Sequence, residues 1–230
     1  MAALVFLSSV AFGNPFKDFV KDLTSNGSGA GLDEKTIIAG LKEALEIGTK
    51  KAVSRVSKKN GYFKTPEIKI PLPPELKSVG EKLILIGFKK KVNEFVESMN
   101  RAAEKAAPEA VDIFVDSVKQ MTIKKAVDIL RGEDDSATRY FEETTRLRLY
   151  SIFYPIIKRA MDKVGVTRIY KFLIGKYNSI PFVKKKSCDI EKYVTNKALD
   201  GLFYMIAREE KKIRKDPAAR ITDLLKKVFS

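Results

Sequence analysis

Apolar residues recur at the spacing of an α-helix along most of the chain. From residue 33 to about residue 60 they stand three or four positions apart, which puts them on one helix face. The same spacing returns in eight further stretches. These lie at about 75–86, 89–106, 108–118, 122–130, 137–164, 167–177, 189–215 and 217–228. The pattern predicts an all-α fold, a single α-helical domain of about eight or nine helices over residues 33–230.

Between residues 62 and 72 the spacing changes from helical to alternating. Ile68, Ile70 and Leu72 alternate with polar residues and Pro71, which predicts at most one short β-hairpin or extended segment near 62–72. Because proline has no N–H to donate to a neighbouring strand, we expect an edge or a wrapped segment here and not a central strand.

Local signals define some of the helix boundaries. Thr122 and Asp189 each precede an apolar stripe, and both residue types are good N-caps. Pro155 falls inside the long stretch 137–164, where it removes one backbone hydrogen bond, so we expect a kink or a break there.

The amino-terminal residues differ from the rest of the chain. Residues 2–13 are apolar and uncharged, too short to span a bilayer but of the length found in the apolar part of an export signal. We expect an export leader at 1–13, complete or truncated, and a flexible linker at 14–32; a short amphipathic or buried helix is the alternative. If the leader is a signal peptide, the protein is extracytoplasmic (periplasmic), and otherwise it is cytoplasmic.

Composition excludes several kinds of chemistry. The 230 residues include no His and a single Cys, Cys188. Without His there is no imidazole acid–base catalysis, no Ser-His-Asp or Cys-His catalysis and no His-containing zinc site. The glycine-rich phosphate-binding motifs are absent as well. We therefore predict no catalytic residues, no metal and no cofactor; an enzyme that uses carboxylate and Lys chemistry without His is the alternative.

The charge of the chain is strongly positive. It has 44 Lys and Arg against 29 Asp and Glu, a net charge of +15, with a balance of +5 over residues 1–130 and +10 over residues 131–230. The clustered lysines are Lys89, Lys90, Lys91, Lys184, Lys185, Lys186, Lys211 and Lys212. Such a basic surface suits anionic lipid or envelope polymer, and an evenly solvated surface is the alternative reading. The sequence contains no recognisable nucleic-acid-binding motif, so a nucleic-acid partner is not expected.

Two sets of polar residues lie beside apolar stripes on separate predicted helices. Asn100 and Glu104 are four positions apart, and Asn196 and Asp200 repeat that spacing. The full set is Asn100, Arg101, Glu104, Asn196, Asp200 and Arg220. We predict that it converges between helices and is buried, with Asp200 paired to one of the two arginines. It is either a structural network or a ligand site. Gly201 predicts the close approach of a neighbouring helix.

Aromatic residues are frequent on the two helices around Pro155. They are Tyr150, Phe153, Tyr154, Tyr170, Phe172 and Tyr177. Large side chains beside a kinked helix suit an apolar cavity for a lipid-like ligand, and their spacing suits ordinary core packing equally well.

Several strings, in order along the chain, carry a family resemblance. They are GLKEAL at 40–45, IPLP at 70–73, MNRAAE at 99–104, ATRYF at 137–141, YVTNKALDGLF at 193–203 and IRKDPAAR at 213–220. Together they resemble the bacterial family known as domain of unknown function 4197 (DUF4197). The resemblance covers roughly residues 33–229. It implies a helical protein, often with an export leader, and it implies no activity, ligand or catalytic residue.

These features predict a non-catalytic, extracytoplasmic binding or scaffold protein. Its basic surface would contact an anionic membrane surface or another envelope component, and an apolar groove would take a lipid-like ligand. The two alternatives are the enzyme described above and a cytoplasmic nucleic-acid-binding protein.

Overall fold

The helices follow the predicted stretches closely. The computed structural model describes residues 34–163 and 165–229, and within them it contains helices and no β-strand, which confirms the all-α prediction. The α-helices are α2 (Glu34–Val56), α3 (Lys77–Leu83), α4 (Lys89–Ala106), α5 (Ala110–Gln120), α6 (Ile123–Arg131), α7 (Ser136–Lys163), α8 (Val166–Asn178), α9 (Ile190–Lys215) and α10 (Asp223–Phe229). Six of these described helices have eleven or more residues.

Four short turns of helix join the longer ones. They are the 3-10 turns η1 (Pro74–Leu76), η3 (Ala107–Glu109) and η4 (Pro217–Ala219), and the wide π-type turn η2 (Ile84–Phe88). The expected leader at 1–13 and the linker at 14–32 lie outside the described residues.

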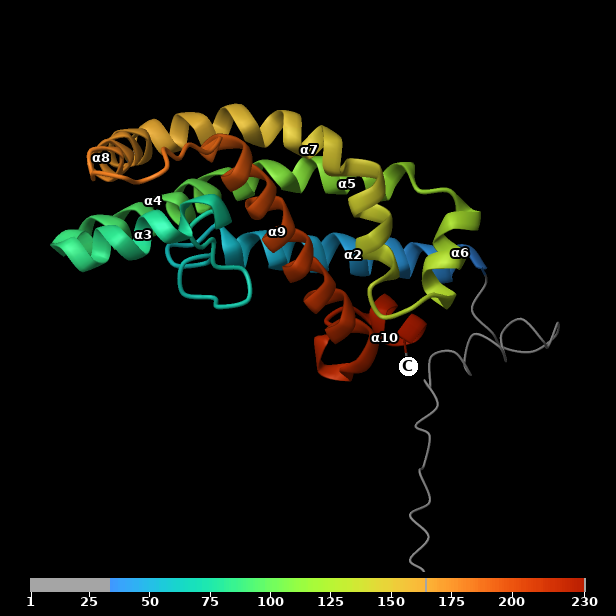
Figure 1. The fold of residues 1–230 in the computed structure, drawn as a ribbon. Helices are drawn as coiled ribbons and strands as arrows, with labels where there is room; N and C mark the ends of the chain where they lie inside the picture. The colour runs from blue at the N-terminus through green and yellow to red at the C-terminus, as the bar shows by residue number, and fades with distance from the viewer. Residues whose placement is uncertain (1–33, 164, 230) are drawn as a thin grey trace, which may run out of the picture.

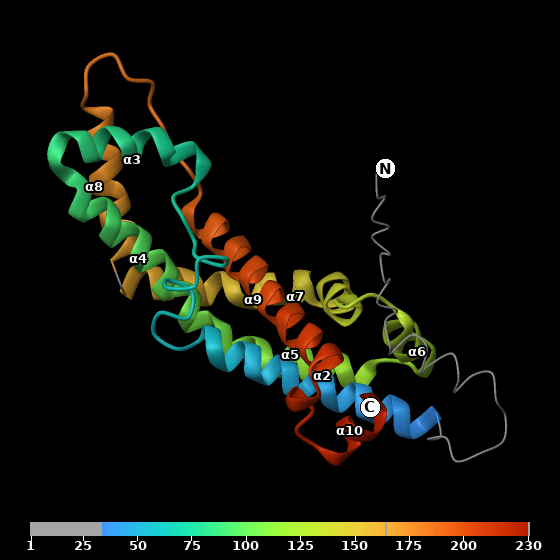
Figure 2. The same cartoon turned by 90° about the horizontal axis from the view of Figure 1, so that it is seen from below.

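Helix α9 crosses the middle of an elongated bundle. It packs against α7, α2 and α4, as Figures 1 and 2 show. Helices α3 and α8 lie together at one end of the molecule, whereas α6 and α10 lie toward the other. The core is built from the predicted apolar stripes and includes aromatic rings in contact. The ring of Phe114 lies 5.4 Å from that of Phe141 and 5.7 Å from that of Phe203, centroid to centroid.

The predicted boundary signals act as expected at two helices. The Thr122 hydroxyl accepts a hydrogen bond from the backbone N–H of Lys125 at the start of α6, and Asp189 accepts one from Lys192 at the start of α9. These bonds satisfy N–H groups that have no partner inside the helix. Pro155 does not end its helix, because α7 continues past it to Lys163.

Residues 57–73 join α2 to η1 through successive turns and an extended stretch. The extended stretch has no strand partner among the described residues. Instead the backbone N–H of Ile70 donates to Asn100 Oδ1, and Asn100 Nδ2 donates to the carbonyl of Ile70, both at 2.9 Å. One side-chain amide thus supplies the donor and the acceptor that a neighbouring strand would give. The segment is wrapped against α4, as Pro71 predicted.

Candidate functional site

The polar face of α4 holds the connection between α2 and η1 in place. Glu104, only 4% exposed, accepts hydrogen bonds from the backbone N–H groups of Tyr62 at 3.2 Å and Phe63 at 3.3 Å. Arg101 bridges Glu104 at 2.7 Å and the Asn60 side chain at 2.8 Å. Because buried polar groups must find partners, this arrangement fixes the path of the segment. Three of the six predicted cluster residues, Asn100 among them, therefore serve the wrapped segment.

Tyr62 joins this segment to α9. Its side chain is fully buried, and its hydroxyl donates to the carbonyl of Ala198 at 2.6 Å. Burial raises the pKa of Tyr62 far above its usual value. A Cβ atom at Gly201 would lie 2.7 Å from the Tyr62 ring, so only glycine fits there. The predicted close approach at Gly201 is real, but the neighbour is the wrapped segment and not a helix.

The other three residues of the predicted cluster lie elsewhere, so the prediction of one buried set was wrong. Asp200 is exposed, and its carboxylate pairs with Arg146 of α7 at 2.5 Å and with Lys197 at 3.2 Å. Asn196 donates to the Lys192 carbonyl within its own helix. Residues four apart share a helix face, but that spacing does not say which neighbour the face meets.

Arg220 acts at the far end of α9. Its guanidinium donates to the carbonyls of Ile213 and Arg214, both at 3.3 Å. These carbonyls belong to the last turn of the helix, where intrahelical partners are missing. Arg220 therefore closes the carboxyl end of α9 and does not pair with Asp200.

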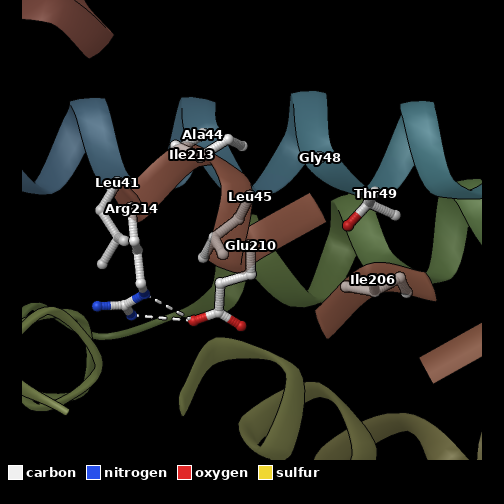
Figure 3. Close-up of a pocket in the computed structure, with 9 residues that line it drawn as sticks. All are labelled: Leu41, Ala44, Leu45, Gly48, Thr49, Ile206, Glu210, Ile213 and Arg214. Carbon is white, nitrogen blue, oxygen red and sulfur yellow. Dashed lines mark hydrogen bonds and ion pairs between the residues drawn. The ribbon is translucent and has the colours of Figure 1, made fainter. Parts of the chain in front are cut away.

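A buried ion pair within α9, which the sequence did not predict, lies against the start of α7, and Figure 3 shows its two side chains. Glu210 is 5% exposed, and its carboxylate accepts bonds from Ala137 N–H at 3.0 Å, from Thr138 N–H and hydroxyl at 2.9 Å, and from Arg214 at 2.9 Å. Burial raises the pKa of Glu210, an effect that Arg214 and the donors of α7 oppose. The carboxylate caps the first turn of α7. In the sequence, the spacing of four residues between Glu210 and Arg214 could have indicated that these two side chains pair on one helix face.

A small cavity lies beside this pair, between α2 and α9 (Figure 3). Its volume is about 10 Å³, and its lining includes Gly48, Thr49 and Ile206. A cavity of this size holds about one water molecule. Thr49 is fully buried, and its hydroxyl has no hydrogen-bond partner among the described residues. The cavity is too small for an organic ligand.

The aromatic residues flanking Pro155 differ in burial. Phe153 is fully buried and Tyr177 is 3% exposed. Tyr150 and Tyr154 are partly buried and stack on each other with ring centroids 5.9 Å apart. Ordinary packing, the alternative stated for these residues, accounts for the buried ones, whereas Phe172 is exposed.

Two segments distant in sequence meet at the end of the molecule that holds α3 and α8 (Figure 2). Phe88 and Phe172 pack edge to face with ring centroids 5.5 Å apart, and Lys82 Nζ lies 5.8 Å from the centre of the Tyr177 ring. We call residues 77–91 and 165–189 together the basic end. They contain eleven Lys and Arg and two acidic residues, a balance of +9 out of +15 for the whole chain.

The loop that follows α8 is tied back to that helix. The Tyr170 hydroxyl accepts from the backbone N–H of Cys188 at 2.9 Å and lies 3.2 Å from its carbonyl. The Cys188 thiol lies 3.9 Å from the Glu75 carboxylate, and burial followed by the charge of Glu75 raises the pKa of Cys188 to about 11. These contacts keep the loop carrying Lys184, Lys185 and Lys186 at the basic end.

Large apolar side chains project into solvent at the same end. Among the described residues eight large hydrophobic side chains are exposed, and five of them belong to the basic end. These five are Ile84 (40% exposed), Leu85 (84%), Ile86 (53%), Phe172 (39%) and Phe182 (108%). We call the first three the apolar tip. The turn behind the tip depends on Gly87, whose φ of 92° is unfavourable for any residue with a Cβ atom.

The predicted basic clusters separate in the fold. Lys89, Lys90 and Lys91 follow the apolar tip and belong to the basic end with Lys184, Lys185 and Lys186. Lys211 and Lys212 lie near the other end of α9, toward α10 (Figure 1).

An open groove lies beside the apolar tip. It has a volume of about 1400 Å³ and runs between residues 63–77 and the first half of α4, with Ile84 and Gly87 also in its wall.

A comparison with protein families gives one match that covers nearly the whole chain. The model of the family described as "Protein of unknown function (DUF4197)" matches residues 31–230. The chain belongs to this family.

The DUF4197 match spans the wrapped segment, both buried carboxylates, the groove and the basic end, and it assigns none of them a function. A search of curated proteins and a search of solved structures found no match to the chain. In the part of this DUF4197 chain that the structure describes, no helix has both the length and the apolar character to cross a bilayer.

Proposed function

We propose that this DUF4197 protein is a non-catalytic, extracytoplasmic protein that binds the surface of anionic membranes through its basic end. The observation that carries the proposal is the coincidence of exposed apolar side chains and unbalanced positive charge at one end of the bundle. Exposed apolar patches on soluble proteins mark interaction sites. Apolar side chains surrounded by lysines are the composition of elements that lie at the membrane interface.

The expected energies are sufficient for reversible binding. Fully burying an exposed Leu or Ile side chain is worth about 1.5–3 kcal/mol; in the apolar tip Leu85 is 84% exposed, whereas Ile84 (40%) and Ile86 (53%) have less surface left to bury and contribute less. Each lysine near an anionic surface adds about 1 kcal/mol. Lys89, Lys90, Lys184 and Lys185 are exposed and form no ion pair with the described residues, so their charges are available to headgroups.

Anionic lipid is favoured over a soluble envelope polymer because of the apolar tip. A hydrophilic polymer would neutralise the lysines but would leave Leu85 in water, whereas a bilayer satisfies both. The buried carboxylates Glu104 and Glu210 are occupied by backbone and arginine donors, which supports a structural role for them and weighs against the enzyme alternative.

Vesicle sedimentation tests the proposal. The full chain should bind phosphatidylglycerol-containing vesicles, bind phosphatidylcholine vesicles much more weakly, and lose affinity as salt rises. Leu85→Asp should reduce binding at least tenfold. Leu147→Asp is its matched control, since Leu147 is 88% exposed on α7, outside the basic end. Equal binding to both vesicle types, or equal effects of the two substitutions, would refute the proposal.

A charge reversal supplies a second matched pair. Lys89→Glu should weaken vesicle binding, whereas Lys211→Glu, an equal change of charge near the other end of α9, should not. The extracytoplasmic location has its own test. Intact-mass measurement on protein from its native host should show that residues 1–13 have been removed, and a mass that includes Met1 would contradict the location.

A further inference from the structure

We infer that the groove beside the apolar tip binds one single-chain anionic amphiphile, a molecule with a phosphate-type head and an alkyl chain. The inference rests on the proposed function in that it names a ligand at the same end of the molecule. The groove adjoins the tip because Ile84 belongs to both. A ligand held at the membrane surface therefore has a short path into it.

The negative charges that line the groove are paired, whereas most of its positive charges form no ion pair with the described residues. Both acidic residues in the wall are already paired, Glu94 with Lys91 at 2.8 Å and Glu97 with Arg101 at 2.8 Å. The lysines that line it are Lys69, Lys77, Lys89 and Lys90. Among the described residues the last three form no ion pair, and Lys69 lies 4.7 Å from the centre of the Phe63 ring. The groove consequently presents unpaired cations and neutralised anions, which selects an anionic head.

The rest of the wall is largely apolar. It includes Leu72, Val92 and Val96, together with Pro71 and Pro74. Its volume of about 1400 Å³ exceeds the range of about 300–1,000 Å³ that is usual for compact small-molecule pockets. An open groove with an apolar part of its wall suits an alkyl chain, because burying each CH₂ group of the chain is favourable.

Other ligand classes fit the groove less well. An extended peptide that adds a strand needs a free backbone edge, but the N–H and carbonyl of Ile70 are both bonded to Asn100. Free phosphate would use the lysines and leave the apolar wall uncovered. An alkyl phosphate uses both parts of the groove.

Calorimetric titration of the full chain with dodecyl phosphate, below its micelle concentration, tests the inference. We expect saturable binding of one molecule per chain. Inorganic phosphate and the uncharged dodecyl maltoside should each bind at least tenfold more weakly. Phosphate binding as tightly as dodecyl phosphate would replace the amphiphile by a simple anion site. Binding that does not saturate at one molecule, or no binding at all, would overturn the inference.

Paired variants separate this inference from the proposed function. Lys77→Glu, an exposed change in the groove wall, should weaken dodecyl phosphate binding at least fivefold. Lys185→Glu and Leu85→Asp lie outside the groove and should weaken vesicle binding while leaving dodecyl phosphate binding unchanged. If the chain binds dodecyl phosphate but no vesicles, the membrane proposal fails and the groove stands. If Lys77→Glu binds dodecyl phosphate normally, the groove assignment fails.

Discussion

Removal of the Glu210 carboxylate should be among the most destabilising single changes in this protein. Glu210→Ala removes the acceptor of the Ala137 and Thr138 N–H groups and takes the paired carboxylate away from Arg214, a residue that is 8% exposed. Breaking a buried ion pair by removing one partner costs about 3–5 kcal/mol. Arg214 keeps its bond to the Ile129 carbonyl at 2.9 Å, so we expect a value near the lower limit.

The adjacent residue provides a matched control. Glu209 pairs with a basic side chain three positions away, Lys212 at 3.2 Å; the Glu209 side chain is 12% exposed, but that of Lys212 is 46% exposed. A pair whose cation is open to solvent is worth about 0–1 kcal/mol. Urea unfolding followed by circular dichroism should therefore show a much larger fall in the free energy of unfolding for Glu210→Ala than for Glu209→Ala. Equal losses would refute the assignment of Glu210 as the cap of α7.

Three further changes test other parts of the structure. The folded chain keeps Tyr62 protonated above pH 10 while the unfolded chain ionises it, so stability should fall there by up to about 1.4 kcal/mol per pH unit from this group; urea titrations at pH 9 to 11 should show a shallower fall for Tyr62→Phe. Thr49→Val removes a buried hydroxyl that lacks a partner and should raise the free energy of unfolding by about 1 kcal/mol; a loss would mean that a water molecule in the cavity bonds the hydroxyl. Asp200→Ala breaks only ion pairs that are open to solvent and should cost about 0–1 kcal/mol in the same assay, and a cost of several kcal/mol would contradict the exposed position of Asp200.

The sequence predicted the helices well because their signals are local. An apolar stripe and an N-cap such as Thr122 or Asp189 each act on residues only a few positions away. The wrapped segment was also within reach, since Pro71 excludes a central strand. Its partner was not, because nothing in the sequence indicates that the Asn100 amide stands opposite Ile70, thirty residues away.

The candidate site was harder to predict because it depends on what is left uncovered. Ile84, Leu85 and Ile86 follow the apolar stripe of α3 and look like core residues in the sequence. In the fold α3 packs against α4 and α8, and these three side chains remain exposed. The lysines near residues 90 and 185 are conspicuous in the sequence, but their meeting depends on contacts such as Phe88 with Phe172. For Asp200 the sequence predicted the helix correctly but predicted the wrong partner, because its carboxylate pairs with Arg146 and not with Arg101 or Arg220.

The setting of Cys188 has a consequence for the redox behaviour of the chain. Only the thiolate form attacks disulfides or reacts readily with oxidants. With its pKa raised to about 11, Cys188 is ionised in only about one molecule in ten thousand at pH 7. In an oxidising compartment outside the cytoplasm, where exposed thiols pair with one another, this cysteine should therefore form intermolecular disulfides more slowly than a thiol with an ordinary pKa.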